Sequence, residues 1–242
     1  MSETSPIKNP LRERLDEVRR RIASATKRSN RVPEEVTLIA VSKTHPVEML
    51  SQALDVGVTD FGENRVQEAD TKITELGRHQ ARWHLIGHLQ ANKARRAVLL
   101  FDIIHSIDSV QLARRLNRLC AEEGRDELPV LIQVDLADEE TKSGASVEAL
   151  PELVTAVTSC ERLRLVGLMT LPPFFEDAEM VRPFFRRLRE LRDALGARGD
   201  FDAHPGELSM GMSHDFEIAI EEGATMVRVG TLIFGARAMN SN

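Results

Sequence analysis

A lysine stands at the end of the first strongly apolar run of this 242-residue chain. Residues 38–43 read LIAVSK, and the enrichment in β-branched and apolar residues predicts a β-strand. Because side chains alternate between the two faces of a strand, Lys43 shares a face with Ile39 and Val41. An amine at the mouth of an apolar strand is partly desolvated, which favours its neutral form and lets it attack a carbonyl carbon. Lys43 is therefore a candidate Schiff-base nucleophile; the alternative is a lysine that only extends to solvent.

Small and hydroxyl-bearing residues follow two later apolar runs. One stretch reaches from Ser209 through Met210 to Ser213, and the other is Gly230 with Thr231. Residues of this kind expose backbone N–H groups and lead into helix N-termini, where a phosphate group binds favourably. Ordinary helix capping and turn formation explain each stretch alone. If both stretches lie at the same end of the fold, they predict a phosphate site.

An arginine precedes the second stretch. Arg228 stands two residues before Gly230, so both share one face of the expected strand. A buried guanidinium beside a phosphate-anchored ligand can donate a hydrogen bond to a ring atom or a carboxylate, and an ion pair with a buried acid such as Asp135 or Glu63 is the alternative. Together, the lysine, the phosphate site and the arginine describe a pocket for pyridoxal 5′-phosphate (PLP), in which Lys43 would hold the aldehyde carbon as an internal aldimine.

The elements that must position these residues alternate along the chain. Apolar runs predict strands at residues 37–42, 60–62, 82–86, 102–106, 130–136, 164–169, 207–210 and 226–229. Helical spacing predicts helices between them, at residues 46–56, 65–76, 110–123, 147–158 and 179–195. This alternation predicts an α/β fold, a (β/α)8 TIM-type barrel, and a doubly wound open sheet is the alternative. In such a barrel the site lies at the C-terminal ends of the strands, where Lys43 and both hydroxyl-bearing stretches would fall.

Two further features complete the predicted organisation of the chain: an additional helix before the first strand and a proline within a helical segment. Leu11, Leu15, Val18 and Ile22 recur at helical spacing and predict an extra N-terminal helix. We expect one domain, 1–242, with an N-terminal arm and helix over 1–35 and the barrel over 36–242. Pro183 should interrupt the helical segment at 179–195, so residues 171–183 are expected to form a loop that leads into a helix.

Composition restricts the function classes. A chain that is 42% hydrophobic and 29% charged is a globular protein, and its net charge of −6 disfavours nucleic acid as a partner. Residues 1–9 lack the apolar core of a secretory signal, and no stretch is long and apolar enough to predict a membrane span. Two cysteines, Cys120 and Cys160, indicate a reduced compartment without a disulfide framework. We expect a cytoplasmic protein without nucleic-acid or membrane partners.

A metal hydrolase can be considered from His84 and His88, which stand four residues apart. That spacing provides metal ligands on a helix, but here Gly87 lies between the histidines and no adjacent glutamate completes a His-Glu-x-x-His motif. We therefore expect no metal site, and interpret both histidines as strand-end and loop residues near the pocket.

Several motifs in order carry a resemblance that runs nearly end to end. They are AVSKT at 40–44, FGEN at 61–64, WHLIGHLQ at 83–90, NK at 92–93, GLMT at 167–170, LSMGMS at 208–213 and VRVGT at 227–231. On these motifs the chain resembles the pyridoxal phosphate homeostasis protein (YggS/PROSC) family. The resemblance implies one barrel like the N-terminal domain of alanine racemase, with PLP bound to Lys43. It also implies a set of further cofactor-binding residues: Ser213, Gly230 and Thr231 at the phosphate, Arg228 at the ring nitrogen, Asn64 close to the cofactor, and Met210 of the same motif as Ser213. Arg65 stands where family members commonly have tyrosine.

A cofactor carrier is favoured over an enzyme. Alanine racemase uses a lysine and a tyrosine as its two bases, and this chain contains no tyrosine. A guanidinium at the ring nitrogen does not readily give up a proton, so the ring is a weak electron sink. We expect a monomer that holds PLP without a catalytic residue, and the resemblance implies PLP-dependent apoenzymes as recipients. The alternative is a barrel enzyme with a Schiff-base lysine, either racemase-like or class I aldolase-like.

Overall fold

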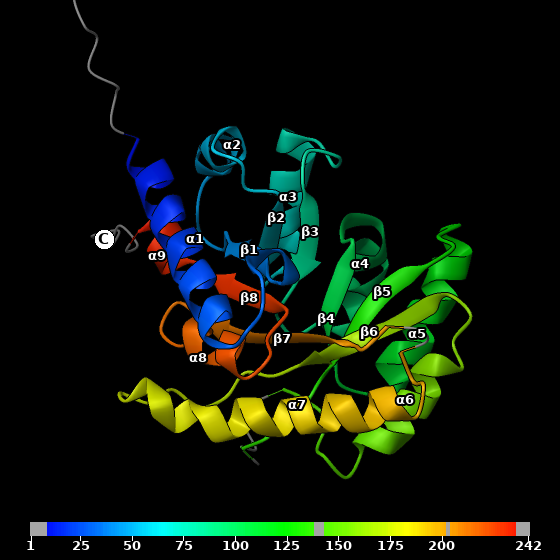
Figure 1. Cartoon of the computed structure of the whole chain (residues 1–242). Helices are drawn as coiled ribbons and strands as arrows, with labels where there is room; N and C mark the ends of the chain where they lie inside the picture. The colour runs from blue at the N-terminus through cyan, green and yellow to red at the C-terminus, as the bar shows by residue number, and fades with distance from the viewer. Residues whose placement is uncertain (1–8, 138–142, 202–203, 236–242) are drawn as a thin grey trace, which may run out of the picture.

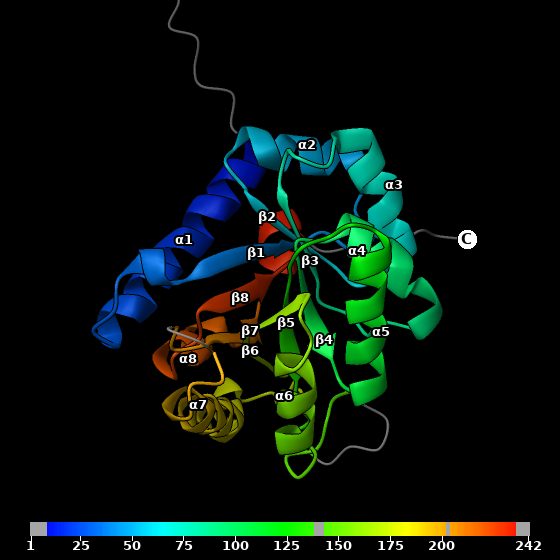
Figure 2. The ribbon, with the colours of Figure 1, turned by 90° about the vertical axis from the view of Figure 1, so that its right-hand side faces the viewer.

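Eight parallel strands close into a barrel in their order along the chain in this computed structural model (Figures 1 and 2). The strands are β1 Thr37–Val41, β2 Asp60–Glu63, β3 Arg82–Leu85, β4 Ile103–Ile107, β5 Leu128–Gln133, β6 Leu163–Met169, β7 Glu207–Met212 and β8 Met226–Val229. The ring closes where β1 pairs with β8, with Ile39 opposite Arg228. The predicted TIM-type barrel is confirmed, and the open sheet is excluded.

The structure describes residues 9–137, 143–201 and 204–235. The expectation that residues 1–9 carry no secretory signal therefore lies, except for Asn9, outside the described residues. Helices pack around the barrel, and they are α1 Pro10–Arg28, α2 Val47–Asp55, α3 Val66–Leu76, α4 Ala94–Leu100, α5 Val110–Glu122, α6 Leu150–Thr158, α7 Arg182–Ala197, α8 Phe216–Glu221 and α9 Thr231–Phe234.

The extra N-terminal helix is present as α1. The Asn9 side chain caps it by accepting hydrogen bonds from the first backbone N–H groups, and Leu11, Leu15, Val18 and Ile22 are buried as their spacing predicts. This apolar face packs against α8 and α9, next to β8 (Figure 1). The helix therefore supports the elements that follow β7 and β8.

Apolar side chains form two layers. The larger core lies between the strands and the helices and includes Phe61 and Trp83, which are fully buried. A smaller cluster comprises Ile39, Ile103, Leu131, Val166, Met169 and Met226 from strands around the ring. Because successive strand side chains alternate, this smaller cluster identifies the barrel interior.

Two local predictions have different outcomes. The predicted helix break at Pro183 is confirmed, because a 3-10 turn at Ala178–Val181 precedes α7 and Pro183 lies in its first turn. The predicted end of the seventh strand at residue 210 is wrong, because β7 continues to Met212. The pairing of β7 with β8 shifts register between Ser209 and Met212, around Gly211 with φ +91°. Gly211 and Ser213 are residue types that favour a loop, but the chain continues to Met212 as an irregular strand.

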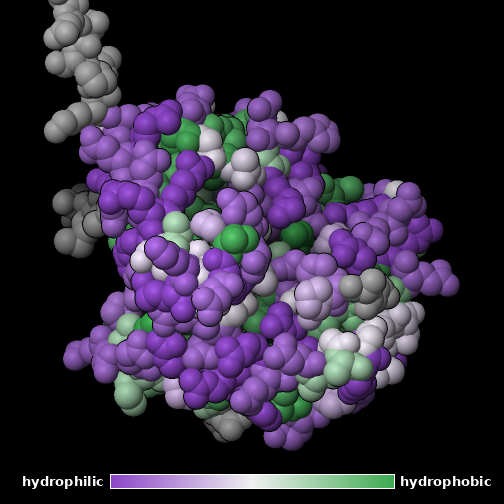
Figure 3. All heavy atoms as spheres, in the orientation of Figure 1, coloured by the Kyte–Doolittle hydropathy of each residue, from purple (hydrophilic) through white to green (hydrophobic). Residues whose placement is uncertain are grey.

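The face drawn in Figure 3 is mainly hydrophilic, and its hydrophobic residues form small separate patches. Among the helices of the described ranges, none combines the length and the apolar character that crossing a bilayer requires.

Candidate functional site

Lys43 lies two residues beyond the C-terminal end of β1 and is partly buried. Its two neighbours are held by one cluster of side chains. The Ser42 carbonyl accepts a hydrogen bond from Lys72 Nζ at 2.7 Å, and the Thr44 N–H donates to Glu68 Oε1. Thr44 has φ +67°, a left-handed conformation that is unusual for a threonine. The backbone on both sides of Lys43 is therefore fixed.

The cluster that holds this segment is ionic, with Glu63 and Lys72 buried and Glu68 partly exposed. Lys72 of α3 lies 2.7 Å from Glu63 Oε1 and 2.6 Å from Glu68 Oε1, and the Ser42 hydroxyl donates to Glu63 at 2.6 Å. Burial raises the pKa of Glu63, although Lys72 opposes this shift, while the contacts of Glu68 with Lys72 and Thr44 outweigh burial and lower the pKa of that carboxyl. Removing one member of such a cluster leaves an uncompensated buried charge.

The segment of Lys43 lies beside the end of β8. A Cβ atom on Gly230 would lie 3.1 Å from the Val41 carbonyl oxygen, so the two strands approach more closely than a side chain at this position allows without displacement. The His45 ring packs against Phe234 of α9, with 4.8 Å between the ring centroids. The strand that presents the lysine is thus in contact with the strand that precedes the predicted phosphate site.

The two predicted phosphate-binding stretches meet. The Gly230 N–H donates a hydrogen bond to Ser213 Oγ at 3.3 Å, which joins the residue after β7 to the residue after β8. Ser213 is partly buried, and Thr231 is exposed at the first position of α9. Two hydroxyl groups and backbone N–H groups at one end of the barrel are donors that fit a phosphate ester.

Arg228 lies within the barrel and is 2% exposed. Its Nη1 donates to Ser209 Oγ at 2.7 Å, and its Nη2 donates to the Thr170 carbonyl at 2.9 Å. Burial lowers the pKa of Arg228 to about 10, against the opposing charge of Asp215, so the guanidinium stays charged at neutral pH. Glu63, one of the acids considered as its ion-pair partner, pairs with Lys72 instead.

The structure gives Met210 a different place from the remaining predicted site residues. Its side chain is fully buried and belongs to the larger core between the strands and the helices. The resemblance implied Met210 as a cofactor contact, and the residue lies inside β7, as predicted for the strand at 207–210. Its side chain is therefore assigned to packing.

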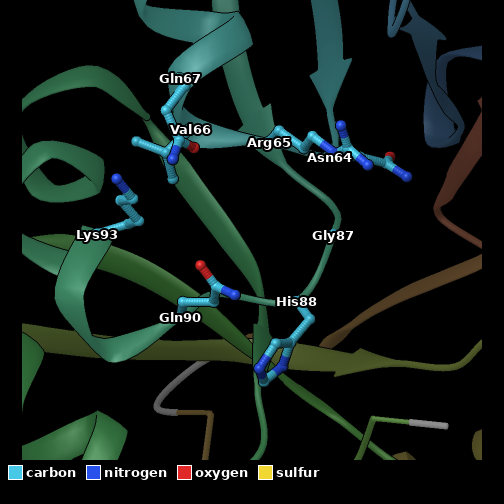
Figure 4. Close-up of a pocket in the computed structure, with 8 residues that line it drawn as sticks. All are labelled: Asn64, Arg65, Val66, Gln67, Gly87, His88, Gln90 and Lys93. Atoms are coloured by element: carbon cyan, nitrogen blue, oxygen red, sulfur yellow. The ribbon is translucent and has the colours of Figure 1, made fainter.

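Asn64 directly follows β2 and lines a cleft of about 640 Å³ beside the barrel opening. Figure 4 draws Asn64 and Arg65 on one side of this cleft, with Lys93 and Gln90 on the other. A Cβ atom on Gly87 would lie 2.3 Å from the Asn64 carbonyl oxygen, so glycine is required for the close approach of these two segments. Cations and amides make this cleft polar.

The two histidines of the metal hypothesis are separated. His88 lines the cleft and contacts Asp108 at 3.1 Å, as expected for a loop residue. His84, expected at a strand end near the pocket, is fully buried within β3 and lies 2.9 Å from Asp60. Within the described ranges, no group of three or more His, Cys, Asp or Glu side chains could hold a metal ion.

Sequence reasoning missed several residues around the site. Lys72 and Glu68 hold the Lys43 segment, and His105 belongs to the interior chain that reaches Arg228 through Ser209. One signal could have identified the interior chain: polar residues at strand positions that the two-residue alternation assigns to the inside of the barrel.

Comparisons with known proteins agree with this architecture. The family described as "Alanine racemase, N-terminal domain" matches residues 14–238. A curated relative from Aquifex aeolicus is 43% identical over 93% of this chain and 97% of its own length, and one from Escherichia coli strain K12 is 45% identical over 95% and 97%. Both relatives are named pyridoxal phosphate homeostasis protein.

Solved structures are similar to this chain over the same extent. PipY of Synechococcus elongatus, solved without PLP, has a TM-score of 0.82 at 39% identity and covers 93% of this chain and all of its own; the same protein with PLP bound scores 0.80 at 38% identity. Alanine racemase from Corynebacterium glutamicum, at 16% identity and a TM-score of 0.63, shares the fold over 62% of its own length. The chain therefore belongs to the pyridoxal phosphate homeostasis proteins, within the alanine racemase N-terminal domain family.

Proposed function

We propose that this protein binds PLP at the C-terminal opening of its barrel and acts in PLP homeostasis. The observation that carries the proposal is the arrangement of the strand ends at β1, β8 and β7. The lysine follows β1, β1 pairs with β8, and the ends of β8 and β7 are joined by the hydrogen bond between Gly230 and Ser213. An amine and a set of phosphate donors on neighbouring strands suit a ligand that carries an aldehyde and a phosphate.

Each residue has a role in this proposal. PLP, when bound, supplies an aldehyde that condenses reversibly with an amine, and Lys43 provides that amine. Ser213, Gly230 and Thr231 bind the phosphate through hydroxyl and backbone N–H groups. Arg228 donates a hydrogen bond to the ring nitrogen and keeps it unprotonated.

The other two predicted cofactor contacts, Asn64 and Met210, have unequal support. Asn64 keeps its proposed position next to the cofactor, supported by its place directly after β2 and in the polar cleft. Met210 contributes only through the packing of β7 against the helices, because its side chain is fully buried in the larger core.

We further propose that the protein holds and releases PLP without a dedicated turnover of its own. Support comes from the absence of tyrosine in the sequence and from the charged guanidinium of Arg228 at the proposed ring position. A ring nitrogen that faces a guanidinium stays neutral, which slows chemistry that depends on carbanion stabilisation. A one-domain organisation, a monomeric state, a cytoplasmic location and transfer to PLP-dependent apoenzymes remain predictions of the sequence.

Titration with PLP tests the proposal. The protein should develop a visible absorbance band that saturates with one PLP per chain and disappears on addition of sodium borohydride. The variant Lys43→Ala should lose the band, and Lys93→Ala, which removes an amine from the neighbouring cleft, should keep it. Absence of a band in the unmodified protein at saturating PLP would overturn the proposal and would favour the aldolase alternative, which needs no added cofactor.

A further inference from the structure

A continuous chain of polar side chains crosses the barrel interior. Asp60 Oδ1 lies 2.9 Å from His84 Nε2, and His84 Nδ1 lies 3.0 Å from His105 Nε2. His105 Nδ1 lies 2.9 Å from Ser209 Oγ, which accepts a hydrogen bond from Arg228 Nη1 at 2.7 Å. The links come from β2, β3, β4, β7 and β8, so the chain joins five of the eight strands.

All members of this chain are shielded from water. Asp60 is the most accessible at 8%, Arg228 is 2% exposed, and the two histidines and Ser209 are fully buried. Polar groups at this depth cost free energy unless each is paired, and low local polarity strengthens the hydrogen bonds that are made. A buried chain in which every polar group is hydrogen-bonded therefore has few alternative hydrogen-bond patterns.

The two ends of the chain set the direction of every hydrogen bond. A guanidinium only donates, so Ser209 Oγ accepts from Arg228. Its own hydrogen points to His105 Nδ1, because the Asp60 carboxylate at the other end only accepts and each neutral histidine between them carries a single proton. A neutral His105 then carries its proton on Nε2 and donates to His84 Nδ1.

The same reasoning extends to the carboxylate end. His84, accepting at Nδ1, carries its own proton on Nε2 and donates to Asp60, which as a carboxylate only accepts. Both histidines are thereby assigned the Nε2–H form.

The electrostatics agree with this assignment. Burial lowers the pKa of His84, against the contacts with Asp60, and holds the pKa of His105 well below its ordinary value, so both rings are neutral. Burial raises the pKa of Asp60, but hydrogen bonds from His84 and Thr59 outweigh it, and the pKa falls to about 2. Arg82 also lies 2.8 Å from Asp60 Oδ1 and anchors this end at the barrel rim. The chain therefore runs from a cation to an anion through neutral groups.

We propose that Asp60, His84, His105 and Ser209 form a directional hydrogen-bond chain that positions Arg228 for the ring nitrogen of PLP. They are positioning residues, since they act through Arg228. With Nη1 held by Ser209 and Nη2 by the Thr170 carbonyl, the plane of the guanidinium is fixed from two sides. The positioning role rests on the proposed function only because it names PLP as the ligand that Arg228 faces. The direction of the hydrogen bonds is the same without any ligand.

The first test uses protein freed of cofactor, labelled with ¹⁵N-histidine, and two-bond ¹H–¹⁵N spectra that distinguish the two neutral forms. His84 and His105 should both show the Nε2–H form. The variant Ser209→Ala should move the ¹⁵N shifts of His84, which Ser209 does not contact directly, because it removes the donor that fixes His105. A protonated ring, an Nδ1–H form at either histidine, or unchanged His84 shifts in the variant would overturn the chain.

The second test measures PLP affinity. Asp60→Asn can donate as well as accept, so it disturbs the direction of the chain, and we expect about tenfold weaker binding. Asp102→Asn is the matched control, because Asp102 lies at the same end of the barrel but bonds to Arg78 and the Trp83 N–H instead. Equal affinities of the unmodified protein and the Asp60 variant would overturn the positioning role. Failure of the unmodified protein to bind PLP at all would instead overturn the proposed function and leave the histidine spectra valid.

Discussion

The backbone N–H of Gly230 and the hydroxyl of Ser213 lie 3.3 Å apart, and their hydrogen bond joins the chain after β8 to the chain after β7. The two residues are separated in sequence by α8, which α1 supports from outside. This contact joins the two parts of the proposed phosphate site, and the pairing of β8 with β1 places the chain after β8 next to the segment of Lys43.

Loss of the Ser213 hydroxyl should weaken PLP binding. Ser213→Ala removes a phosphate donor and leaves the Gly230 N–H without its acceptor, so we expect about tenfold weaker binding and a change in unfolding free energy of less than about 1 kcal/mol. Ser159→Ala, an exposed hydroxyl at the end of α6, is the control and should bind normally. Unchanged affinity in Ser213→Ala, measured by absorbance titration, would remove Ser213 from the site.

Much of the fold could be predicted because strands and helices have different periods, and each apolar run in this sequence is short. The predicted site at the strand ends followed from the same reasoning, because a barrel brings those ends together. The boundary of β7 could not be predicted in this way. Gly211 and Ser213 are residue types that are typical of loops, whereas the strand continues to Met212 through an irregular pairing with β8.

Contacts across the barrel interior could not be predicted from the sequence, for a different reason. The polar residues Asp60, His84, His105 and Ser209 each lie inside a predicted strand, but which of them meet depends on the stagger of all strands around the ring. The role of Lys72 depends on the rotation of α3 about its axis, which helical periodicity alone leaves undetermined at a polar position.

The buried ionic cluster beside Lys43 should contribute strongly to stability. Lys72→Met leaves the fully buried Glu63 without its cation, and we expect a loss of about 3–5 kcal/mol in unfolding free energy by urea denaturation. Adding Glu63→Leu to this variant should recover most of that loss, because the unpaired charge is gone. If Lys72→Met costs less than about 1 kcal/mol, the cluster does not hold the segment as argued.

Asp60 should make stability depend on pH in the acid range. Its pKa falls from 3.8 to about 2 on folding, so the folded protein binds this proton less tightly than the unfolded chain. The stabilisation, about 2 kcal/mol, is present above pH 4 and is lost as the pH falls toward 2. The difference in unfolding free energy between the unmodified protein and Asp60→Asn should therefore shrink by about 1 kcal/mol between pH 6 and pH 3. A difference that is constant over this range would contradict the lowered pKa.

Arg228→Glu should increase racemisation of amino acids as a side activity. A carboxylate opposite the ring nitrogen favours the protonated ring, which makes bound PLP a stronger electron sink. The measurement is formation of D-alanine from L-alanine by chiral chromatography, on variant protein that circular dichroism shows to be folded and absorbance shows to contain PLP. Rates equal to those of the unmodified protein would show that the guanidinium does not limit this chemistry.

The central claim is that the amine of Lys43 binds PLP covalently, and reduction followed by peptide mapping tests it most directly. The PLP-loaded protein is treated with sodium borohydride, digested and analysed by mass spectrometry. We predict a phosphopyridoxyl group on Lys43, with Lys72 and Lys93 unmodified. A stoichiometric label on a different lysine, or no label on a protein that has bound PLP, would contradict the claim.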